Sequence, residues 1–330
     1  MISVEKLTKH FGPKIAVDDI SFSVEKGEVL GFLGPNGAGK STSMRMITGY
    51  LPPTAGKISV CGFDMVEQPL QGKAKIGYLP ENAPLYSDMT VLGFLGFCAE
   101  LRGLFGAAKS KAIDRVAGLC FLDRVLHQSV DTLSKGYRHR TCLAQALIHD
   151  PEVLVMDEPT DGLDPNQKHE VRMLIREMGN TKAIIFSTHI LEEVEAACTR
   201  ALIIDQGKIV ANGTPSELKS RAPVAGSLVV GLRAVSWKAA QSQLVSLRSL
   251  ERSELIADTD SVLSVRLFPK GHLLPELLDL AHRERWEIQH VAVDEGRLDD
   301  VFRSLTMPDT QLGSDTVRGR EGDTAKRGAV

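Results

Sequence analysis

Residues 34–42 read GPNGAGKST, which fits the phosphate-binding pattern G-x-x-x-x-G-K-[ST]. The residues before it, 29–33, are apolar and typical of a strand. Those after it, 42–48, lack Gly and Pro and alternate as a helix does. The motif therefore lies between a strand and a helix, the context in which it binds a nucleotide's phosphates. A Gly-rich turn that matches by chance is the alternative, and the motifs described below argue against it.

The chemistry of this loop follows from its backbone. Glycines let successive N–H groups turn inward around a polyphosphate, and the helix that begins near Lys40 adds the positive end of its dipole. The Lys40 ammonium is expected to act on the β- and γ-phosphates, and the Ser41 hydroxyl to ligate Mg²⁺. The predicted nucleotide-binding residues of the loop are Gly34, Pro35, Asn36, Gly37, Ala38, Gly39, Lys40, Ser41 and Thr42.

Composition limits the class of protein. The chain has 330 residues, of which 43% are hydrophobic and 25% charged, as in an ordinary globular protein. We see no apolar run long enough to span a membrane and no signal peptide. The net charge of −3 gives no basic footprint, so we expect no nucleic-acid partner. The five cysteines form no C-x-x-C pair, which predicts free thiols in a reducing cytosol.

The first two thirds of the chain read as a cassette with an inserted helical part. Residues 1–33 look β-rich, residues 90–133 are spaced helically, and residues 134–205 alternate between helices and short apolar strands. That alternation predicts an α/β fold with a mostly parallel sheet covered on both faces and ligands at the carboxyl ends of the strands. The expected strands are 2–4, 15–17, 20–24, 29–33, 57–60, 76–79, 153–156, 183–186 and 201–204. The cassette is expected to span 1–220, with a helical subdomain at about 85–150.

A second, smaller unit is predicted after a linker at 221–226. Residues 227–306 follow the order β-α-β-β-α-β-α, which resembles a small ferredoxin-like α+β unit. Its expected strands are 227–233, 253–258, 261–268 and 287–293, and its expected helices are 236–250, 272–285 and 297–306. Residues 307–330 are polar without periodicity, which predicts a disordered tail.

Carboxylates and a histidine follow two of the apolar strands. Asp157 and Glu158 come at the end of strand 153–156, where buried charge is costly unless it meets a cation or a proton to be moved. Asp157 is the candidate Mg²⁺ ligand, and Glu158 is the candidate that orients or deprotonates an attacking water. His189 follows strand 183–186 and is expected to contact the γ-phosphate. An exposed pair of charges and a structural histidine are the alternatives.

A further anion site is predicted at a helix that runs from residue 135 to about 148. Ser134 is placed to cap this helix, and Gly136 lies in its first turn, so free N–H groups point outward. An ordinary helix cap is the alternative. One phosphate loop cannot use two helix N-termini on opposite sides. Two copies arranged head to tail, however, place each nucleotide between Lys40 of one copy and Ser134 of the other.

Taken together, these motifs resemble those of the ATP-binding subunits of ATP-binding cassette (ABC) transporters. The chain is similar to the subfamily that serves ABC-2 type exporters, including drug-export and gliding-motility ATPases. The resemblance covers residues 1–220 closely and implies ATP and Mg²⁺ as ligands. It matches Phe11 to the aromatic that stacks on adenine, residues 34–42 to Walker A, residues 153–158 to Walker B, residues 133–137 to the signature with Ser134 and Gly136, residues 161–165 with Asp164 to the D-loop, and His189 to the switch histidine.

The sequence departs from the family pattern at two places. Glu81 stands where the family mostly has Gln, and as a charged Mg²⁺ or water ligand it is expected to keep sensing the γ-phosphate. Lys135 and Tyr137 replace the usual Gly and Gln of the signature, while the two residues that contact phosphate are retained.

The function that these motifs favour is an ATP-hydrolysing subunit that works as a homodimer. It energises a separate ABC-2 type permease from the inner face of the cell membrane. Leu85, Tyr86 and Met89 are candidates to contact that partner, although packing under the helical part is an equal alternative. A soluble regulator or translation factor built on the same cassette is the main alternative function. Two cassettes and basic RNA-binding segments are usual in such proteins.

Overall fold

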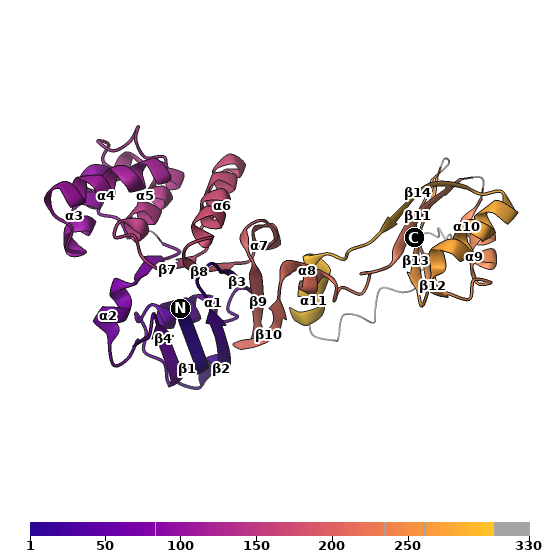
Figure 1. Cartoon of the computed structure of the whole chain (residues 1–330), viewed down its shortest axis with the longest axis horizontal. Helices are drawn as coiled ribbons and strands as arrows, with labels where there is room; N and C mark the ends of the chain where they lie inside the picture. Colours follow the sequence, from indigo (N-terminus) through magenta and orange to yellow (C-terminus); the bar gives the residue numbers. More distant parts are fainter. Residues whose placement is uncertain (83, 234, 260–261, 307–330) are drawn as a thin grey trace, which may run out of the picture.

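The computed structural model describes residues 1–82, 84–233, 235–259 and 262–306, and Figure 1 shows how they are arranged. The predicted tail at 307–330 lies outside the described residues. A large α/β part and a smaller α+β part are joined by a narrow neck, beside which helices α8 and α11 lie.

An antiparallel sheet forms the N-terminal face of the large part. Its order is β2-β1-β4-β5, and register shifts interrupt the β1–β2 pairing. The two short strands expected at 15–17 and 20–24 are one long strand, because these irregularities let the pairing continue through the polar residues between them. The strands are β1 (Ile2–Phe11), β2 (Lys14–Val24), β4 (Ala55–Val60) and β5 (Phe63–Asp64).

The central sheet has six strands in the order β10-β9-β3-β8-β7-β6. Five are parallel and buried on both faces, as their continuous apolar sequences predict, and β10 pairs antiparallel at the edge. Strand β10 was not predicted, because its mixture of polar and apolar residues gives a weak pattern. The strands are β3 (Val29–Leu33), β6 (Ile76–Leu79), β7 (Val153–Asp157), β8 (Ala183–Thr188), β9 (Arg200–Asp205) and β10 (Lys208–Gly213).

Helices cover this sheet and build the inserted helical part. The helical part packs on the face of β6–β8 that carries Leu154 and Met156, while Val153 and Val155 point into the core on the other face. The helices of the large part are α1 (Lys40–Ile47), α2 (Pro69–Ala74), α3 (Val91–Leu101), α4 (Gly106–Leu119), the 3₁₀ turn Val130–Thr132, α5 (Lys135–Leu147), α6 (Pro165–Gly179), α7 (Leu191–Ala197) and α8 (Pro215–Lys219).

The smaller part confirms the expected ferredoxin-like order. Its sheet runs β12-β13-β11-β14 with every neighbouring pair antiparallel, and α9 and α10 contribute leucines to the hydrophobic cluster on one face. Helix α9 ends earlier than predicted and β12 begins earlier. The elements are β11 (Leu228–Arg233), α9 (Trp237–Leu244), β12 (Leu250–Asp258), β13 (Leu263–Pro269), α10 (Leu273–Glu284) and β14 (Glu287–Val293).

Helix α11 (Leu298–Thr306) corrects the predicted extent of the second unit. Its apolar face carries Leu298 and Val301, both 1% exposed, and packs against Val194 of α7, Ala201 of β9 and Leu218 of α8. Figure 1 shows it beside α8, away from the sheet of β11–β14. The last predicted helix of the unit at 227–306 therefore packs on the large part, because the chain returns there to cover an apolar surface.

Candidate nucleotide-binding site

The phosphate loop takes a conformation that requires glycine. Gly39 has a φ of 108° and caps α1, and a Cβ on it would lie 2.5 Å from the carbonyl oxygen of Ala16. A side chain at this position would be strained by both its backbone angle and its neighbour. The tight turn brings the start of α1 directly under the loop, so the helix N-terminus faces the predicted phosphate site.

Lys40 lies under this loop as a buried cation. Its side chain is 6% exposed, and Nζ donates to the carbonyl oxygens of Gly34 at 2.7 Å and Pro35 at 3.2 Å. Nζ lies 3.9 Å from Oε1 of Glu158. Burial lowers the pKa of Lys40, and the nearby carboxylates, Glu158 first, oppose that shift. These partners hold the ammonium at the loop, where phosphate oxygens can become its acceptors.

A cavity of about 570 Å³ brings most of the predicted residues together. Four separate parts of the sequence meet there: the β1–β2 turn, the phosphate loop, the segment after β6 and the segment after β7. Phe11 is 49% exposed at its rim, in the place expected for an adenine-stacking ring. The lining residues are Phe11, Lys14, Ala16, Asn36, Gly37, Gly39, Lys40, Ser41, Thr42, Glu81 and Glu158, of which Lys14 and Ala16 were not predicted.

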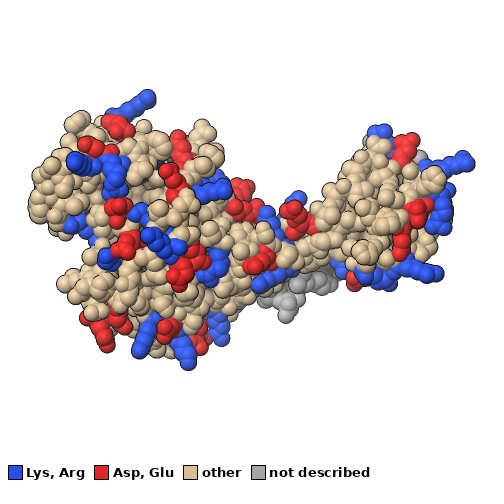
Figure 2. Space-filling model, in the orientation of Figure 1, with Lys and Arg blue, Asp and Glu red and all other residues tan. Residues whose placement is uncertain are grey.

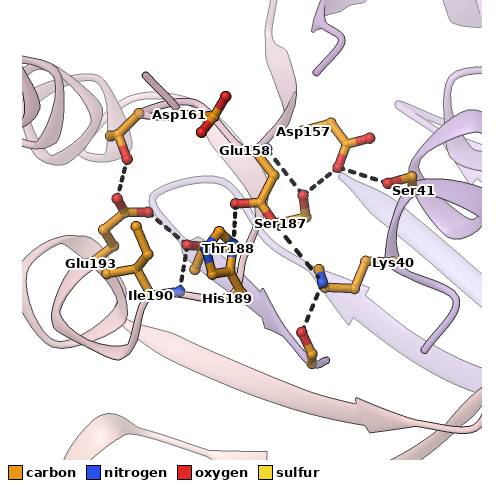
Figure 3. Close-up of polar contacts among 12 residues, drawn as sticks. Lys40, Ser41, Asp157, Glu158, Asp161, Ser187, Thr188, His189, Ile190 and Glu193 are labelled. Carbon is orange, nitrogen blue, oxygen red and sulfur yellow. Dashed lines mark hydrogen bonds and ion pairs between the residues drawn. The ribbon is translucent and has the colours of Figure 1, made fainter. Parts of the chain in front are cut away.

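Asp157 sits behind the loop at the end of β7. It is 1% exposed, and its Oδ1 accepts from the hydroxyls of Ser41 at 3.2 Å and of Ser187 (Figure 3). A hydroxyl and a carboxylate at hydrogen-bond distance form the pair that Mg²⁺ uses when phosphates and water supply its other ligands. Among the residues that the structure describes, no cluster of three or more His, Cys, Asp or Glu could hold a metal by itself. The residues present therefore fit a magnesium ion that arrives with a nucleotide.

Glu158 is held by its backbone in a strained turn. Its φ is +52°, and its N–H donates to both the carbonyl oxygen and the hydroxyl of Ser187. Its Oε2 lies 2.9 Å from Nδ1 of His189, as Figure 3 shows. Burial raises the pKa of Glu158, and the hydrogen bond with His189 opposes that shift. A carboxylate with a raised pKa beside a half-exposed histidine is suited to move a proton at the cavity floor.

The other predicted contacts lie on separate elements. Ser134 caps α5, where its hydroxyl accepts from the N–H of Tyr137, and Gly136 follows in the first turn of that helix. Asp164 caps α6 in a reciprocal capping box with Gln167. The side chains of Ser134 and Asp164 cap their own helices, and none of these three residues lines the cavity.

The sequence reasoning missed a layer of polar residues behind the cavity. Ser187, Thr188, Thr160 and Glu193 are all 2% exposed or less and hydrogen bonded to one another or to Asp157. Thr160 and Thr188 looked like ordinary polar residues at strand and loop ends. Glu193 stands in the acidic run LEEVE at 191–195, where a solvated helix face is the usual interpretation.

Comparison with known proteins agrees with this geometry. The sequence pattern of the family described as ABC transporter matches residues 17–161. The linearmycin resistance ATP-binding protein LnrL of Bacillus subtilis (strain 168) is 34% identical over 310 residues, which cover 93% of this chain and 98% of that protein. The Nod factor export ATP-binding protein I of Paraburkholderia xenovorans (strain LB400) is 34% identical over 306 residues, covering 92% and 96%.

A solved structure shares the fold of the large part. It is described as the dimeric structure of MJ0796, a bacterial ABC transporter cassette. It aligns with a TM-score of 0.61 over 65% of this chain and 98% of that chain, at 21% identity. The expected phosphate-binding-loop cassette is therefore confirmed as the fold of the large part.

Proposed function

Because this chain belongs to the family of ABC transporter ATP-binding proteins, we propose that its ATPase cycle energises export through a separate membrane permease. The observation that carries the proposal is the cavity in which Lys40, Ser41 and Glu158 converge, with Asp157 and His189 behind them. In the part of the chain that the structure covers, no helix has the length and apolarity to cross a membrane. The permease of this proposal is a separate chain, with this chain at its cytoplasmic face.

Each residue of the cavity has a role in this proposal. The Lys40 ammonium and the N–H groups of the loop bind the β- and γ-phosphates, and Phe11 stacks on the adenine. Ser41 and Asp157, with Glu81 at the cavity rim, would hold Mg²⁺, which neutralises phosphate charge when it is bound. Glu158 orients the attacking water and accepts its proton, and His189 holds the Glu158 carboxylate at the γ-phosphate end of the cavity.

The signature end of α5 completes the site only in a homodimer. The capped N-terminus of α5 carries Ser134 and Gly136 on the helical part, away from the loop that holds Lys40. A second copy placed head to tail would bring these N–H groups to the γ-phosphate. The family's cassettes dimerise, and the MJ0796 structure is described as dimeric, which supports this arrangement.

An aromatic surface on the helical part supports a permease contact, and we propose a partner of the ABC-2 type. Tyr86 is 52% exposed and packs edge-on against the rings of Phe94 and Phe97, with ring centroids 6.2 and 5.7 Å apart. Leu85 and Met89 are partly buried against the hydrophobic core of the helical part, which favours a packing role for them over a partner contact. Tyr86 is therefore the residue we expect to contact a cytoplasmic helix of the permease.

The decisive experiment is the Glu158→Gln variant, with Glu192→Gln, an exposed acid on α7, as the matched control. If Glu158 moves the proton, its variant should lose about 10²- to 10⁴-fold in phosphate release while still binding MgATP. The nucleotide-bound dimer should then accumulate on size-exclusion chromatography, and adding Ser134→Arg should abolish it. Unchanged turnover in Glu158→Gln would overturn the assigned role, and a dimer that ignores Ser134→Arg would overturn the shared site.

The permease itself requires a separate test. Purification of the intact membrane-bound complex should recover a polytopic membrane protein with the wild-type chain, and Tyr86→Glu should weaken that association. Recovery of RNA or of ribosomal proteins instead would favour the regulator or translation-factor function.

A further inference from the structure

Glu193 is a buried carboxylate that the mechanism above does not use. It lies in the first turn of α7, is 1% exposed, and belongs to the layer directly behind Glu158 and His189. Burying a carboxylate is costly unless hydrogen bonds compensate for the lost water. The partners of this side chain therefore indicate what the fold gains from it.

Both carboxylate oxygens of Glu193 accept a hydrogen bond, and the two donors lie on different segments of the chain. Oε1 accepts from the hydroxyl of Thr160, two residues after Glu158. Oε2 accepts from the hydroxyl of Thr188 at 2.7 Å, immediately before His189. Thr188 also accepts from the N–H of Ile190 at 3.0 Å, so its hydroxyl fixes the turn that carries the histidine (Figure 3).

One buried side chain thus ties together the two loops that hold the reacting groups. The loop after β7 carries Glu158, and the loop after β8 carries His189. Oε2 of Glu158 lies 2.9 Å from Nδ1 of His189. Both loops begin where a strand ends, so the hydrogen bonds of the sheet do not hold them beyond that point. A displacement of about 1 Å in a reacting group can cost about 10²-fold in rate.

We infer that Glu193 is a positioning residue for ATP hydrolysis, which sets the distance between Glu158 and His189 by holding Thr160 and Thr188. This inference rests on the proposed roles of Glu158 and His189. Glu193 lies outside the cavity lining, so it has no contact with a nucleotide bound there. Its removal should therefore lower kcat and leave the affinity for MgATP unchanged.

The test compares two replacements of similar size in the full-length protein. Glu193→Met fills the same space with an apolar side chain and leaves both threonine hydroxyls without an acceptor. Glu193→Gln keeps one acceptor oxygen, and its amide can donate to the other hydroxyl, which can rotate to accept. We expect kcat to fall about 10- to 100-fold in Glu193→Met and to recover to within a few-fold of wild type in Glu193→Gln.

Two further measurements separate positioning from a general structural role. In Glu193→Met, the affinity for MgATP, by calorimetry, should remain near wild type, and the protein should stay folded at the assay temperature. Its melting temperature should fall modestly, because two buried hydroxyls lose their acceptor. Thr160→Val should lower kcat alone but cost nothing more in the Glu193→Met background, since both changes break the same link. Additive losses, or a parallel loss of nucleotide affinity, would reject the positioning role.

The outcomes also separate this inference from the proposed function. Wild-type kcat in a folded Glu193→Met protein would overturn the inference, whereas wild-type turnover in Glu158→Gln would overturn the proposed function. The exposed Glu192→Gln variant controls for loss of a negative charge from α7 and should behave as wild type in every assay.

Discussion

The cassette and the sheet unit of β11–β14 bury different kinds of side chain. Among the residues the structure describes, the buried charged groups lie in the cassette: Lys40 at the cavity, Asp157 and Glu193 behind it, and Arg140 on α5. The cluster inside the β11–β14 unit is made of leucine, valine and alanine. Most charged residues of that unit lie on its surface, where Figure 2 shows both signs interspersed, and the Arg266–Asp294 pair is only partly exposed. Most of the buried charge therefore lies where we place the chemistry, whereas the core of the smaller unit is apolar.

Helix α11 makes the comparison sharper, because it follows the smaller unit in sequence but packs on the cassette.

The largest expected effect comes from placing an aspartate in each of the two cores. Val301→Asp puts a charge under α11 against the cassette, and Val265→Asp puts one in the β11–β14 cluster. Each should cost at least about 3 kcal/mol in the free energy of unfolding of the part it belongs to.

Nucleotide binding distinguishes the two variants. Val301→Asp should lower the melting temperature of the cassette and reduce the fraction that binds MgATP. Val265→Asp should melt the smaller unit while MgATP binding persists. Unfolding followed by circular dichroism, with and without MgATP, checks both, and equal behaviour of the two variants would show that the parts share one cooperative core.

The misplaced α11 shows where sequence reasoning stops. The spacing of Leu298, Val301, Phe302 and Leu305 predicts an amphipathic helix and its buried face correctly. Periodicity records that a face is buried but not which surface covers it. Proximity in sequence favoured the neighbouring sheet, and only the three-dimensional path shows that the chain returns to α8 and β9.

The candidate site likewise contains residues that local motifs indicate and residues that only tertiary contacts reveal. The convergence of Lys40, Ser41, Asp157, Glu158 and His189 could be predicted, because the phosphate loop and the ends of parallel strands lie at the same edge of the sheet. The hydrogen bonds of Glu193 could not be predicted, because they come from two hydroxyls on segments distant in sequence. Local motifs carry the groups that we expect to touch the ligand, whereas the contacts that hold those groups depend on tertiary structure.

The second prediction contrasts two cations. Lys40→Ala should lower the affinity for MgATP by about two orders of magnitude, because a charge-assisted contact to the phosphates contributes about 1.5–3 kcal/mol. Arg266→Ala removes a cation of the smaller unit that pairs with Asp294 at 2.9 Å and should leave that affinity unchanged. Calorimetric titration of both variants checks this. Equal affinities for Lys40→Ala and wild type would contradict the assigned phosphate site.

The third prediction uses two glutamates whose pKa values move in opposite directions. Burial raises the pKa of Glu158, whereas hydrogen bonds from Ser249 lower that of Glu276 in the smaller unit. A general base works only when deprotonated, so kcat/KM should fall as pH drops through the raised pKa, above the ordinary value of about 4.3. The pH–rate profile should keep this limb in Glu276→Gln. An acid limb at or below the ordinary glutamate pKa would contradict the buried general base.

The smallest expected effects concern one ion pair in each region. Lys135 pairs with Asp161 at 2.9 Å across the signature and the D-loop, with both side chains more than half exposed, whereas the Arg266–Asp294 pair is mostly buried. Solvent screens the first pair, so Lys135→Ala should change the free energy of unfolding by less than about 1 kcal/mol. Arg266→Ala leaves Asp294 less well compensated in a drier setting and should cost more. Denaturant unfolding of each variant measures this order. If Lys135→Ala proves the more costly change, the pair holds the signature to the D-loop, and the departure at Lys135 from the family's usual glycine has a structural role within one copy.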